Sequence, residues 1–411
     1  MKVLFLHQAF PSANEEGSGR AYDFAKYLVQ QGHEVTIIAG RFSYLAGHAL
    51  TNTSRGFIVR EAHPEGFLIL RPWSYMGYHK SYFRRMLTFI TYMVTSFIAS
   101  LSAGKFDLVV GATPPISVGI VGALVAFFKR TPYVFEVRDL WSEVAIQLGF
   151  IKNRILIAVV RKVEQKIYQF ASRIVINSPG FTAHLEAIGI PRERIKFVPN
   201  GVDLDIFQAG MDGNEVRVRY GLRDRVVAVY AGSLGMANDI DTILSAAELT
   251  RDEDISFMLV GDGKERCNLE QKCLERGINN VIFTGPQKKQ DVPLFFAAAD
   301  AGVVTLLDIP LFKTVYPNKV FDTMACGKPV VLLVDGVARQ LVEEADAGLF
   351  VPPGNSVKLA QAMIYLRDNP NEAHAMGRRG RAFLEGRYGR VKCAQLMHNV
   401  LIDLYHQEVV R

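Results

Sequence analysis

Apolar, β-branched runs that do not alternate with polar residues recur along the chain, and stretches with helical spacing separate them. Examples are 3–6, 106–111 and 133–137 in the first half and 226–231 and 255–260 in the second. Such runs are typical of strands buried on both faces of a parallel sheet, and the helices between them serve as crossovers. The pattern therefore predicts an α/β protein assembled from βα units.

The alternation is interrupted near the middle of the chain. Pro199 and Gly201 break it, and a polar stretch that contains glycine follows, as in a linker. At 411 residues the chain is also too long for one ordinary core, since domains hold roughly 150–200 residues. We expect two doubly wound, Rossmann-like domains over 1–199 and 200–385 that face each other across a cleft, and a helix over 386–411 that packs back on the first domain.

The stretch 314–334 of the second half reads T-V-Y-P-N-K-V-F-D-T-M-A-C-G-K-P-V-V-L-L-V. Pro317 suits the first position of a helix and Gly327 the residue just past its end, so the sequence predicts a short helix that feeds a buried strand. The helix start offers backbone N–H groups to an anion, and Asp322 offers a carboxylate one turn further in. A nucleotide carries both complements, a diphosphate and a ribose diol.

Charge is divided unevenly between the two halves. Residues 1–200 hold 23 Lys and Arg against 13 Asp and Glu, and residues 201–411 hold 24 against 28, so the halves carry +10 and −4. The basic half can face nucleic acid, anionic lipid or a phosphorylated substrate, or it can simply be a solvated face. Because the sequence shows neither a helix-turn-helix nor a basic-aromatic sheet signature, we expect no nucleic-acid partner.

The cysteines and the N-terminus bear on the compartment. Four cysteines show no C-x-x-C pair and no His spacing typical of a metal site, so we expect them to be reduced. The apolar run 3–6 is too short for the core of a signal peptide and is interpreted as a first strand. Together these features predict a cytoplasmic protein.

Segment 71–105 contains no Asp or Glu and interleaves aromatic with basic residues. Its apolar run 86–101 falls short of the roughly 20 residues that a membrane-spanning helix needs. One interpretation is an interfacial helix that lies on an anionic membrane, with Lys80, Arg84 and Arg85 in contact with it. The other is a core helix of the first domain, preceded by a basic segment that is exposed to solvent.

Polar and glycine residues follow several predicted strands, at the edge where open α/β sheets bind ligands. Gly17 and Gly19 come after the first strand, where they serve either a ligand or a flexible turn. Asp139 follows the strand 133–137. It either meets a ligand or caps the next helix, an alternative that Ser142 and Glu143 keep open.

The whole chain resembles the retaining glycosyltransferases of the GT-B fold, family 4. The resemblance rests on H-Q-A-F-P with its glycine loop, Q-G-H-E-V-T, V-P-N-G-V-D, L-V-G-D-G, F-T-G, P-N-K-V-F-D-T-M-A-C-G-K-P-V-V and D-A-G-L-F-V-P-P-G, in this order. The combination of T-V-Y-P-N-K with V-R-D-L-W is similar to the fucosamine-transferase-like branch of bacterial surface-polysaccharide enzymes.

The resemblance implies a donor site in the second domain. Family members carry two Glu eight positions apart, the second of which holds the ribose diol; here these positions are Thr314 and Asp322. An Arg and a Lys that usually follow the strand opening the second domain are missing, and Lys264 and Arg266 are the nearest replacements. The implied donor-binding residues are Gly17, Gly19, Gly232, Ser233, Lys264, Arg266, Pro286, Thr314, Val315, Tyr316, Asn318, Lys319 and Asp322.

The resemblance also implies the reaction. It is a retaining, metal-independent transfer of a sugar, such as an N-acetylated hexosamine or a deoxyhexosamine, from a nucleoside-diphosphate sugar, most simply UDP-linked. The acceptor is lipid-linked or a polysaccharide in surface glycan synthesis, and Asp139 orients acceptor or sugar hydroxyls.

Three D-x-D pairs, at 203, 239 and 252, are interpreted as caps and turns rather than metal ligands, so neither metal nor cofactor is expected. The expected location is peripheral, on the inner face of the cytoplasmic membrane. A GT-B-fold epimerase or a sugar-nucleotide-binding protein without transfer activity is the alternative.

Overall fold

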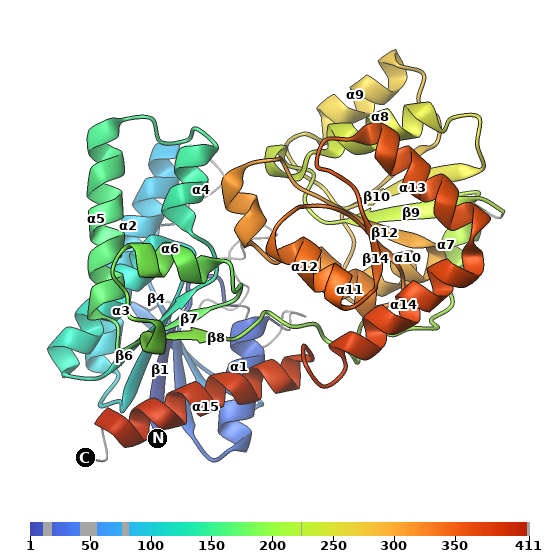
Figure 1. Cartoon of the computed structure of the whole chain (residues 1–411). Coiled ribbons are helices and arrows are strands. Elements are labelled where there is room, and N and C mark those ends of the chain that lie inside the picture. Colours follow the sequence, from blue (N-terminus) through green and yellow to red (C-terminus); the bar gives the residue numbers. More distant parts are fainter. Residues whose placement is uncertain (11–18, 42–55, 76–81, 223, 409–411) are drawn as a thin grey trace. The chain divides into compact units, whose positions relative to one another are not determined.

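The structure is a computed structural model. In it the chain forms two compact units. Unit 1 comprises 1–199 with 391–411, and unit 2 comprises 200–390 (Figure 1). Gly17 and Lys80 lie outside the described residues. The residues described are 1–10, 19–41, 56–75, 82–222 and 224–408, with the backbone alone for 82 and 83.

Unit 1 contains an eight-stranded sheet with the order β3-β4-β2-β1-β5-β6-β7-β8. All neighbours are parallel except β3 and β4, which form an antiparallel hairpin at one edge. The sequence analysis did not find this hairpin. Strand β3 mixes polar and partly exposed residues, and the apolar run of the buried strand β4 comprises only 68–70. The strands are β1 (Lys2–Leu6), β2 (Glu34–Ile38), β3 (Ile58–Ala62), β4 (Leu68–Pro72), β5 (Leu108–Ala112), β6 (Tyr133–Val137), β7 (Arg173–Ile176) and β8 (Ile195–Phe197).

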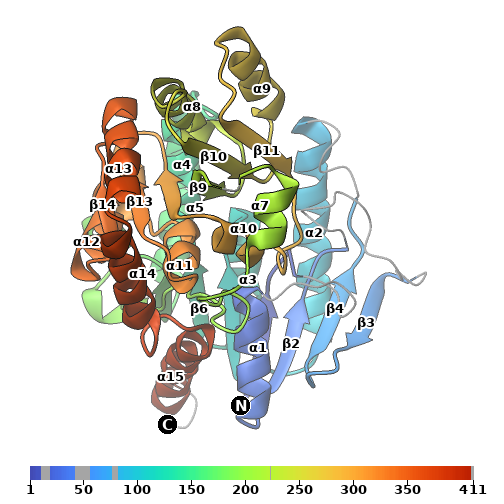
Figure 2. The same ribbon diagram turned by 90° about the vertical axis from the view of Figure 1, so that its right-hand side faces the viewer.

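Helices cover both faces of this sheet (Figures 1 and 2). The last helix joins unit 1, because its Cys393, Met397 and Leu401 are buried in one core with residues of β1, β2 and the first helix. The helices are α1 (Arg20–Gln30), α2 (Tyr82–Ser102), α3 (Ile116–Lys129), α4 (Trp141–Gln147), α5 (Arg154–Phe170), α6 (Phe181–Ala187) and α15 (Arg390–Glu408), with the short 3₁₀ helix η1 (Arg192–Arg194).

Helix α2 is longer than the sixteen-residue run recognised in the sequence. It holds 21 residues, and its part Arg84–Ser102 is long and apolar enough to cross a membrane by length and composition alone. The expectation that this segment is too short to span was therefore wrong on length. The helix nevertheless packs against β2, β4 and α3.

Unit 2 contains a six-stranded, entirely parallel sheet with the order β11-β10-β9-β12-β13-β14. Val227 and Val229 of β9 belong to one buried cluster, whereas Ala228 and Tyr230 belong to another. Both faces of the strand are thus buried, which explains its unalternating apolar sequence. The strands are β9 (Val226–Ala231), β10 (Ile255–Val260), β11 (Val281–Gly285), β12 (Ala301–Thr305), β13 (Val330–Leu333) and β14 (Gly348–Phe350).

In unit 2, one helix precedes the first strand, helices connect the successive strands, and two helices follow the last strand. The helices are α7 (Asn214–Arg219), α8 (Ile240–Leu249), α9 (Arg266–Glu275), α10 (Val292–Ala298), α11 (Asn318–Ala325), α12 (Val337–Glu344), α13 (Ser356–Asp368) and α14 (Pro370–Leu384), with the 3₁₀ helices η2 (Met236–Asn238) and η3 (Pro310–Thr314).

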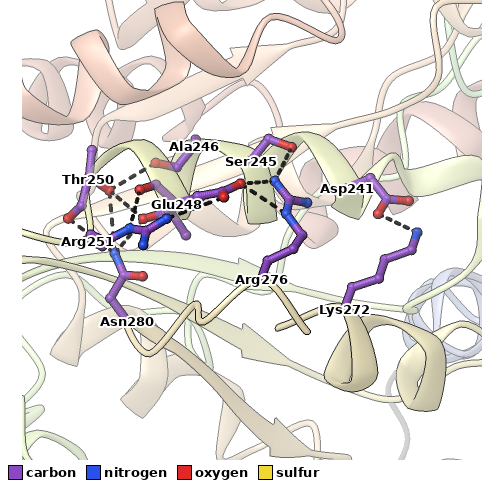
Figure 3. Close-up of polar contacts among 10 residues, drawn as sticks. Asp241, Ser245, Ala246, Glu248, Thr250, Arg251, Lys272, Arg276 and Asn280 are labelled. Carbon is purple, nitrogen blue, oxygen red and sulfur yellow. Dashed lines mark hydrogen bonds and ion pairs between the residues drawn. The ribbon is translucent and has the colours of Figure 1, made fainter. Parts of the chain in front are cut away.

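Polar contacts tie α8 to α9 and to the loop before β11 (Figure 3). Lys272 donates to Asp241 at 2.6 Å, and Arg276 pairs with Glu248. The Asn280 amide donates to the Ala247 carbonyl at 2.9 Å. These contacts fix the helices that follow β9 and β10, and with them the loops at the carboxyl ends of the two strands.

Each sheet has a switch point, where successive connections leave in opposite directions. In unit 1 it lies between β1 and β5, and in unit 2 between β9 and β12. Open α/β sheets bind ligands beyond the carboxyl ends of the strands at this point. The loops after β1, β5, β9 and β12 are therefore where candidate residues should be sought.

Candidate functional site

Three glycine loops meet at the carboxyl edge of the unit 2 sheet. Gly232, Gly261 and Gly285 follow or end β9, β10 and β11, and all have positive φ. The Gly232 N–H donates to the Val260 carbonyl at 2.8 Å, and the Gly261 N–H to the Gly285 carbonyl at 3.0 Å. A Cβ atom on Gly261 would lie 2.0 Å from the Gly232 carbonyl oxygen, so only glycine fits there.

Lys319, in the first turn of α11, reaches the loop after β9. Its Nζ donates to Oδ1 of Asn238 at 3.2 Å and lies 4.9 Å from the centre of the Tyr230 ring. Burial lowers the pKa of this ammonium to about 8, although the nearby Asp322 carboxylate acts in the opposite direction. The loop after β9 contains no Lys or Arg. Lys319 of α11 places an ammonium group beside it.

Gly232 leaves the space that the Lys319 side chain occupies. A Cβ atom on Gly232 would lie 2.5 Å from Cε of Lys319, and its φ of +150° is itself unfavourable for other residues. We expect Gly232→Ala to lower the free energy of unfolding by about 1–3 kcal/mol, the usual cost of such a strained position. The loss should be measured by urea denaturation.

Gly235→Ala in the same loop is the matched control. Gly235 has a φ of −116°, and its Cβ would meet only the Ser233 hydroxyl and the Asn238 amide at ordinary distances. We expect this variant to match the parent protein, and an equal loss in both variants would contradict the role given to Gly232.

Asp322 lies one turn further along α11, on a half-buried position. Burial raises the pKa of its carboxyl to about 6, against the attraction of Arg390, Lys289 and Lys319. A carboxylate that three cations surround and that protein partly covers is suited to accept hydrogen bonds from a neutral diol.

The segment before α11 leads directly into this first turn. The Asn318 side chain accepts a hydrogen bond from the Asn200 amide at 2.8 Å. The Tyr316 ring packs edge-on to Phe321 at 5.8 Å, and the Val315 N–H points back to the Phe312 carbonyl at 3.5 Å. Among these residues, Asn318 and Lys319 begin the helix and present their N–H groups at its positive end.

Thr314 ends the 3₁₀ helix η3, and its hydroxyl donates to the Leu311 carbonyl at 2.6 Å. A threonine there cannot supply a carboxylate, and this contact directs its hydroxyl to its own turn.

The other donor candidates lie on the loops after β9, β10 and β11. Ser233 and Lys264 are exposed, as is Pro286. Arg266 is paired with Glu270 at 2.8 Å, and its Nη1 would lie 3.2 Å from a Cβ on Gly285. Its guanidinium thus lies beside the loop after β11, whereas Lys319 occupies the loop after β9.

In unit 1, Gly19 is the N-cap of α1, and Arg20, the first residue of the helix, is buried. Its guanidinium pairs with Glu136 of β6 and donates to the carbonyls of Pro199 and, at 2.7 Å, Val198. Burial by itself would raise the pKa of Glu136, but Arg20 and Arg138 outweigh it and hold the pKa below its usual value. Arg20 therefore connects Val198 and Pro199 to Glu136 at the carboxyl edge of the sheet.

The carboxyl ends of β1 and β6 bring His7 and Arg138 together. Nη1 of Arg138 lies 3.2 Å from Nε2 of His7. Burial lowers the pKa of His7 to about 4, and Arg138 adds to the decrease, so the imidazole is neutral and Nε2 accepts the hydrogen bond. The sequence analysis missed His7, although its position directly after a buried strand was a usable signal.

Asp139 follows Arg138 and remains exposed. The surrounding protein raises the pKa of its carboxyl, and the Arg138 charge opposes that increase. The capping alternative is not what the structure shows, because α4 begins at Trp141 after Leu140 and has no side-chain cap. Asp139 is thus an accessible carboxylate at the sheet edge.

The two units define a class of protein by their fold, that of the GT-B glycosyltransferases. The crystal structure of HepE from Anabaena in complex with UDP matches 98% of this chain and 100% of its own chain, with a TM-score of 0.73 and 20% sequence identity. Identity at this level shows a common fold. The expected α/β architecture of two doubly wound domains is confirmed.

Family comparisons identify the chain more closely. Residues 17–201 match the family described as "Glycosyl transferase 4-like domain", and residues 214–383 match the family described as "Glycosyl transferases group 1". The two matches together cover most of the chain, which is therefore a glycosyltransferase of the GT-B fold.

Two curated relatives are bacterial. The teichuronic acid biosynthesis glycosyltransferase TuaH of Bacillus subtilis is 27% identical over 51% of this chain and 52% of its own length. The colanic acid biosynthesis glycosyl transferase WcaI of Escherichia coli is 23% identical over 76% of this chain and 78% of its own length. The match with TuaH thus spans about half the length of that relative.

Proposed function

We propose that the protein is a retaining glycosyltransferase that moves a sugar from a UDP-sugar to a lipid-linked or polysaccharide acceptor in the synthesis of a surface glycan. The observation that carries the proposal is the first turn of α11, where Lys319 contacts the loop after β9 and Asp322 lies one turn away. The names of TuaH and WcaI support the pathway class, and the UDP bound to HepE supports the nucleotide.

In this proposal α11 binds the nucleotide through two groups. The Lys319 ammonium and the N–H groups at the helix start hold the diphosphate, and the Asp322 carboxylate accepts hydrogen bonds from the ribose diol. Lys319 takes the place of the Arg and Lys that are missing from the loop after β9. Lys264 and Arg266, which follow β10, contact the solvent-exposed side of the diphosphate.

The reaction breaks the bond between the anomeric carbon and the β-phosphate oxygen, and that oxygen gains negative charge. Preorganised donors at that oxygen are the main source of rate enhancement in such sites. The acceptor oxygen forms the new bond on the same face of the sugar and passes its proton to the departing phosphate. Asp139 orients acceptor or sugar hydroxyls. Because the cations of the chain itself meet the diphosphate, we propose that no metal is required.

The acceptor-dependent release of UDP tests this function. The protein is incubated with UDP-, GDP- and TDP-sugars, each with and without a lipid-linked acceptor, in buffer that contains EDTA. We propose that UDP is released with acceptor only, and that proton NMR of the product shows the anomeric configuration of the donor. Inversion would contradict the retaining mechanism.

Binding without transfer, or epimerisation of the sugar nucleotide, is the second candidate. It is favoured by Thr314, which replaces a carboxylate and directs its hydroxyl to the Leu311 carbonyl. Nucleotide binding without acceptor-dependent release of UDP, or conversion of the UDP-sugar to its epimer, would establish this candidate and exclude the first.

The pH dependence of kcat/KM is a prediction of the same site. Asp322 loses its charge as the pH falls through about 6, and Lys319 loses its charge as the pH rises through about 8. Because the proposed contacts need both charges, we expect a bell-shaped profile with limbs near these values. Asp322→Asn should flatten the acidic limb, and an unchanged limb would exclude Asp322 as its cause.

A further inference from the structure

Three helices of unit 1 form one layer beside its sheet. Contacts join α2 to α3 and α3 to α5, so α3 lies between the other two helices. Their inner faces are part of the core, as Tyr92 of α2, Val121 of α3 and Tyr168 of α5 are buried. Their outer faces differ from those of an ordinary soluble domain.

The outer face of α2 is a continuous apolar stripe. Met86, Ile90, Val94, Ile98 and Leu101 are all exposed, and their spacing of three or four residues places them on one side of the helix. The hydroxyl-bearing residues of the helix lie elsewhere. Such a long exposed stripe is unusual on a solvated surface.

The stripe continues onto the neighbouring helices. On α3, Leu124, Phe127 and Phe128 are exposed, and Phe127 exposes 64% of its surface. Phe128 also contacts Phe97 of α2 edge-on, which joins the two helices at this surface.

Helix α5 adds the third part. Ile155, Leu156, Val159 and Val163 are exposed, with 76% exposure for Ile155. We call these residues and the exposed apolar residues of α2 and α3 the three-helix surface.

Basic residues outnumber acidic ones around the three-helix surface, where Glu143 of α4 pairs with Arg161 at 2.8 Å. The three helices contain a single acidic residue, Glu164, which is buried and accepts a hydrogen bond from Ser142. Basic residues are exposed on the same helices or at their ends, and they are Arg84, Arg85, Lys105, Arg130, Lys152, Arg154, Arg161, Lys162 and Lys166. Apolar side chains fringed by cations are typical of a segment that lies in the interface of an anionic membrane.

We propose that the three-helix surface docks the protein on an anionic lipid bilayer. This extends the interfacial helix expected from Arg84 and Arg85 to α3 and α5, which the sequence analysis did not connect with it. A second copy of the chain is a poorer occupant. In a symmetric contact the basic residues around the surface of one copy would lie against those of the other and repel them.

The protein lies on the bilayer rather than crossing it. Tyr92 of α2 donates its hydroxyl to the Ile38 carbonyl at 3.0 Å, and Ser96 and Ser100 are buried on the same inner face. Insertion of α2 across a membrane would break these contacts with the sheet and expose polar groups to lipid. Only the outer face is available to the bilayer.

Co-sedimentation of the full chain with vesicles tests the proposal. Vesicles of phosphatidylcholine with about one third phosphatidylglycerol should retain the protein. Pure phosphatidylcholine should retain much less, because the basic residues then have no anionic lipid to bind. We expect Val94→Asp and Val159→Asp each to lower the partition coefficient at least about tenfold, since each places a charge within the apolar layer. Lys162→Glu combined with Lys166→Glu should reduce the preference for anionic vesicles about tenfold or more, because the other basic residues of the surface remain.

Leu274→Asp is the matched control. Leu274 lies on α9 of unit 2 and exposes 84% of its surface, yet it is outside the three-helix surface. We expect it to leave retention unchanged, with thermal denaturation showing that all variants are folded.

Three results would overturn the proposal. They are the absence of retention, equal retention by both kinds of vesicle, and a dimer seen by ultracentrifugation without lipid that Val159→Asp dissociates. The last result would assign the surface to a second copy of the chain.

Discussion

Lys319→Met is expected to lower kcat/KM for sugar transfer by about 10²–10³-fold, the usual effect of removing one preorganised donor from a developing oxyanion. The methionine keeps an unbranched apolar chain as far as the position of Cε, but it removes the ammonium that contacts Asn238 and lies over the Tyr230 ring. The proposed site then lacks the cation that replaces two missing residues of the loop after β9. Initial rates of UDP release give the measurement.

A binding comparison separates this role from a merely structural one. Loss of a diphosphate contact should weaken binding of UDP, whereas binding of uridine, measured by calorimetry, should hardly change. Lys313→Met is the matched control, since Lys313 is an exposed lysine of the same segment that pairs with Asp308 at 3.3 Å. Equal losses in the two variants would refute the assignment of Lys319.

Asp322→Asn is expected to raise the KM for the donor by about 10- to 100-fold, which corresponds to the loss of a charged hydrogen-bond acceptor. The same variant should unfold at an unchanged or higher Tm at pH 7. The reason is that the pKa of Asp322 rises from 3.8 when unfolded to about 6 when folded, so the ionised group costs stability above pH 6. The stability that the protonated Asp322 carboxyl provides is fully present only below pH 3.8, and it is lost as the pH rises through about 6.

This combination of weaker donor binding and undiminished stability identifies a functional carboxylate. Donor kinetics and thermal unfolding at pH 7 supply the two measurements. Asp308→Ala, which removes an exposed carboxylate nearby, should change neither the KM nor the Tm. If Asp322→Asn instead lowers the Tm and leaves the KM unchanged, the carboxylate supports the fold and does not bind the ribose.

The central strands of the sheets and the ends of α11 could be predicted from local sequence. Strand β6 has the predicted bounds, and α11 begins after Pro317 and ends before Gly327, whose φ is +68°. Local signals suffice here because a strand buried on both faces has no polar position to obscure it, and proline and glycine have fixed backbone preferences at helix ends.

The candidate site was only partly predictable. The sequence identified Asp322 and Lys319 as members of α11 but assigned the missing cations of the loop after β9 to Lys264 and Arg266. In the structure Lys319 contacts Asn238, which is 81 residues away in the chain, whereas Arg266 pairs with Glu270. A contact at such a separation depends on the order of strands, which no local pattern reports.

The sequence by itself determined the succession of βα units apart from the β3–β4 hairpin. Only the tertiary structure decided that Arg20 holds the carbonyl groups of Val198 and Pro199, that His7 meets Arg138, and that the apolar stripes of α2, α3 and α5 form one surface. The physical reason is that backbone preference and burial act between neighbours in the chain. Pairing of charges and exposure of a helix face depend on which distant segments the folded sheet brings together.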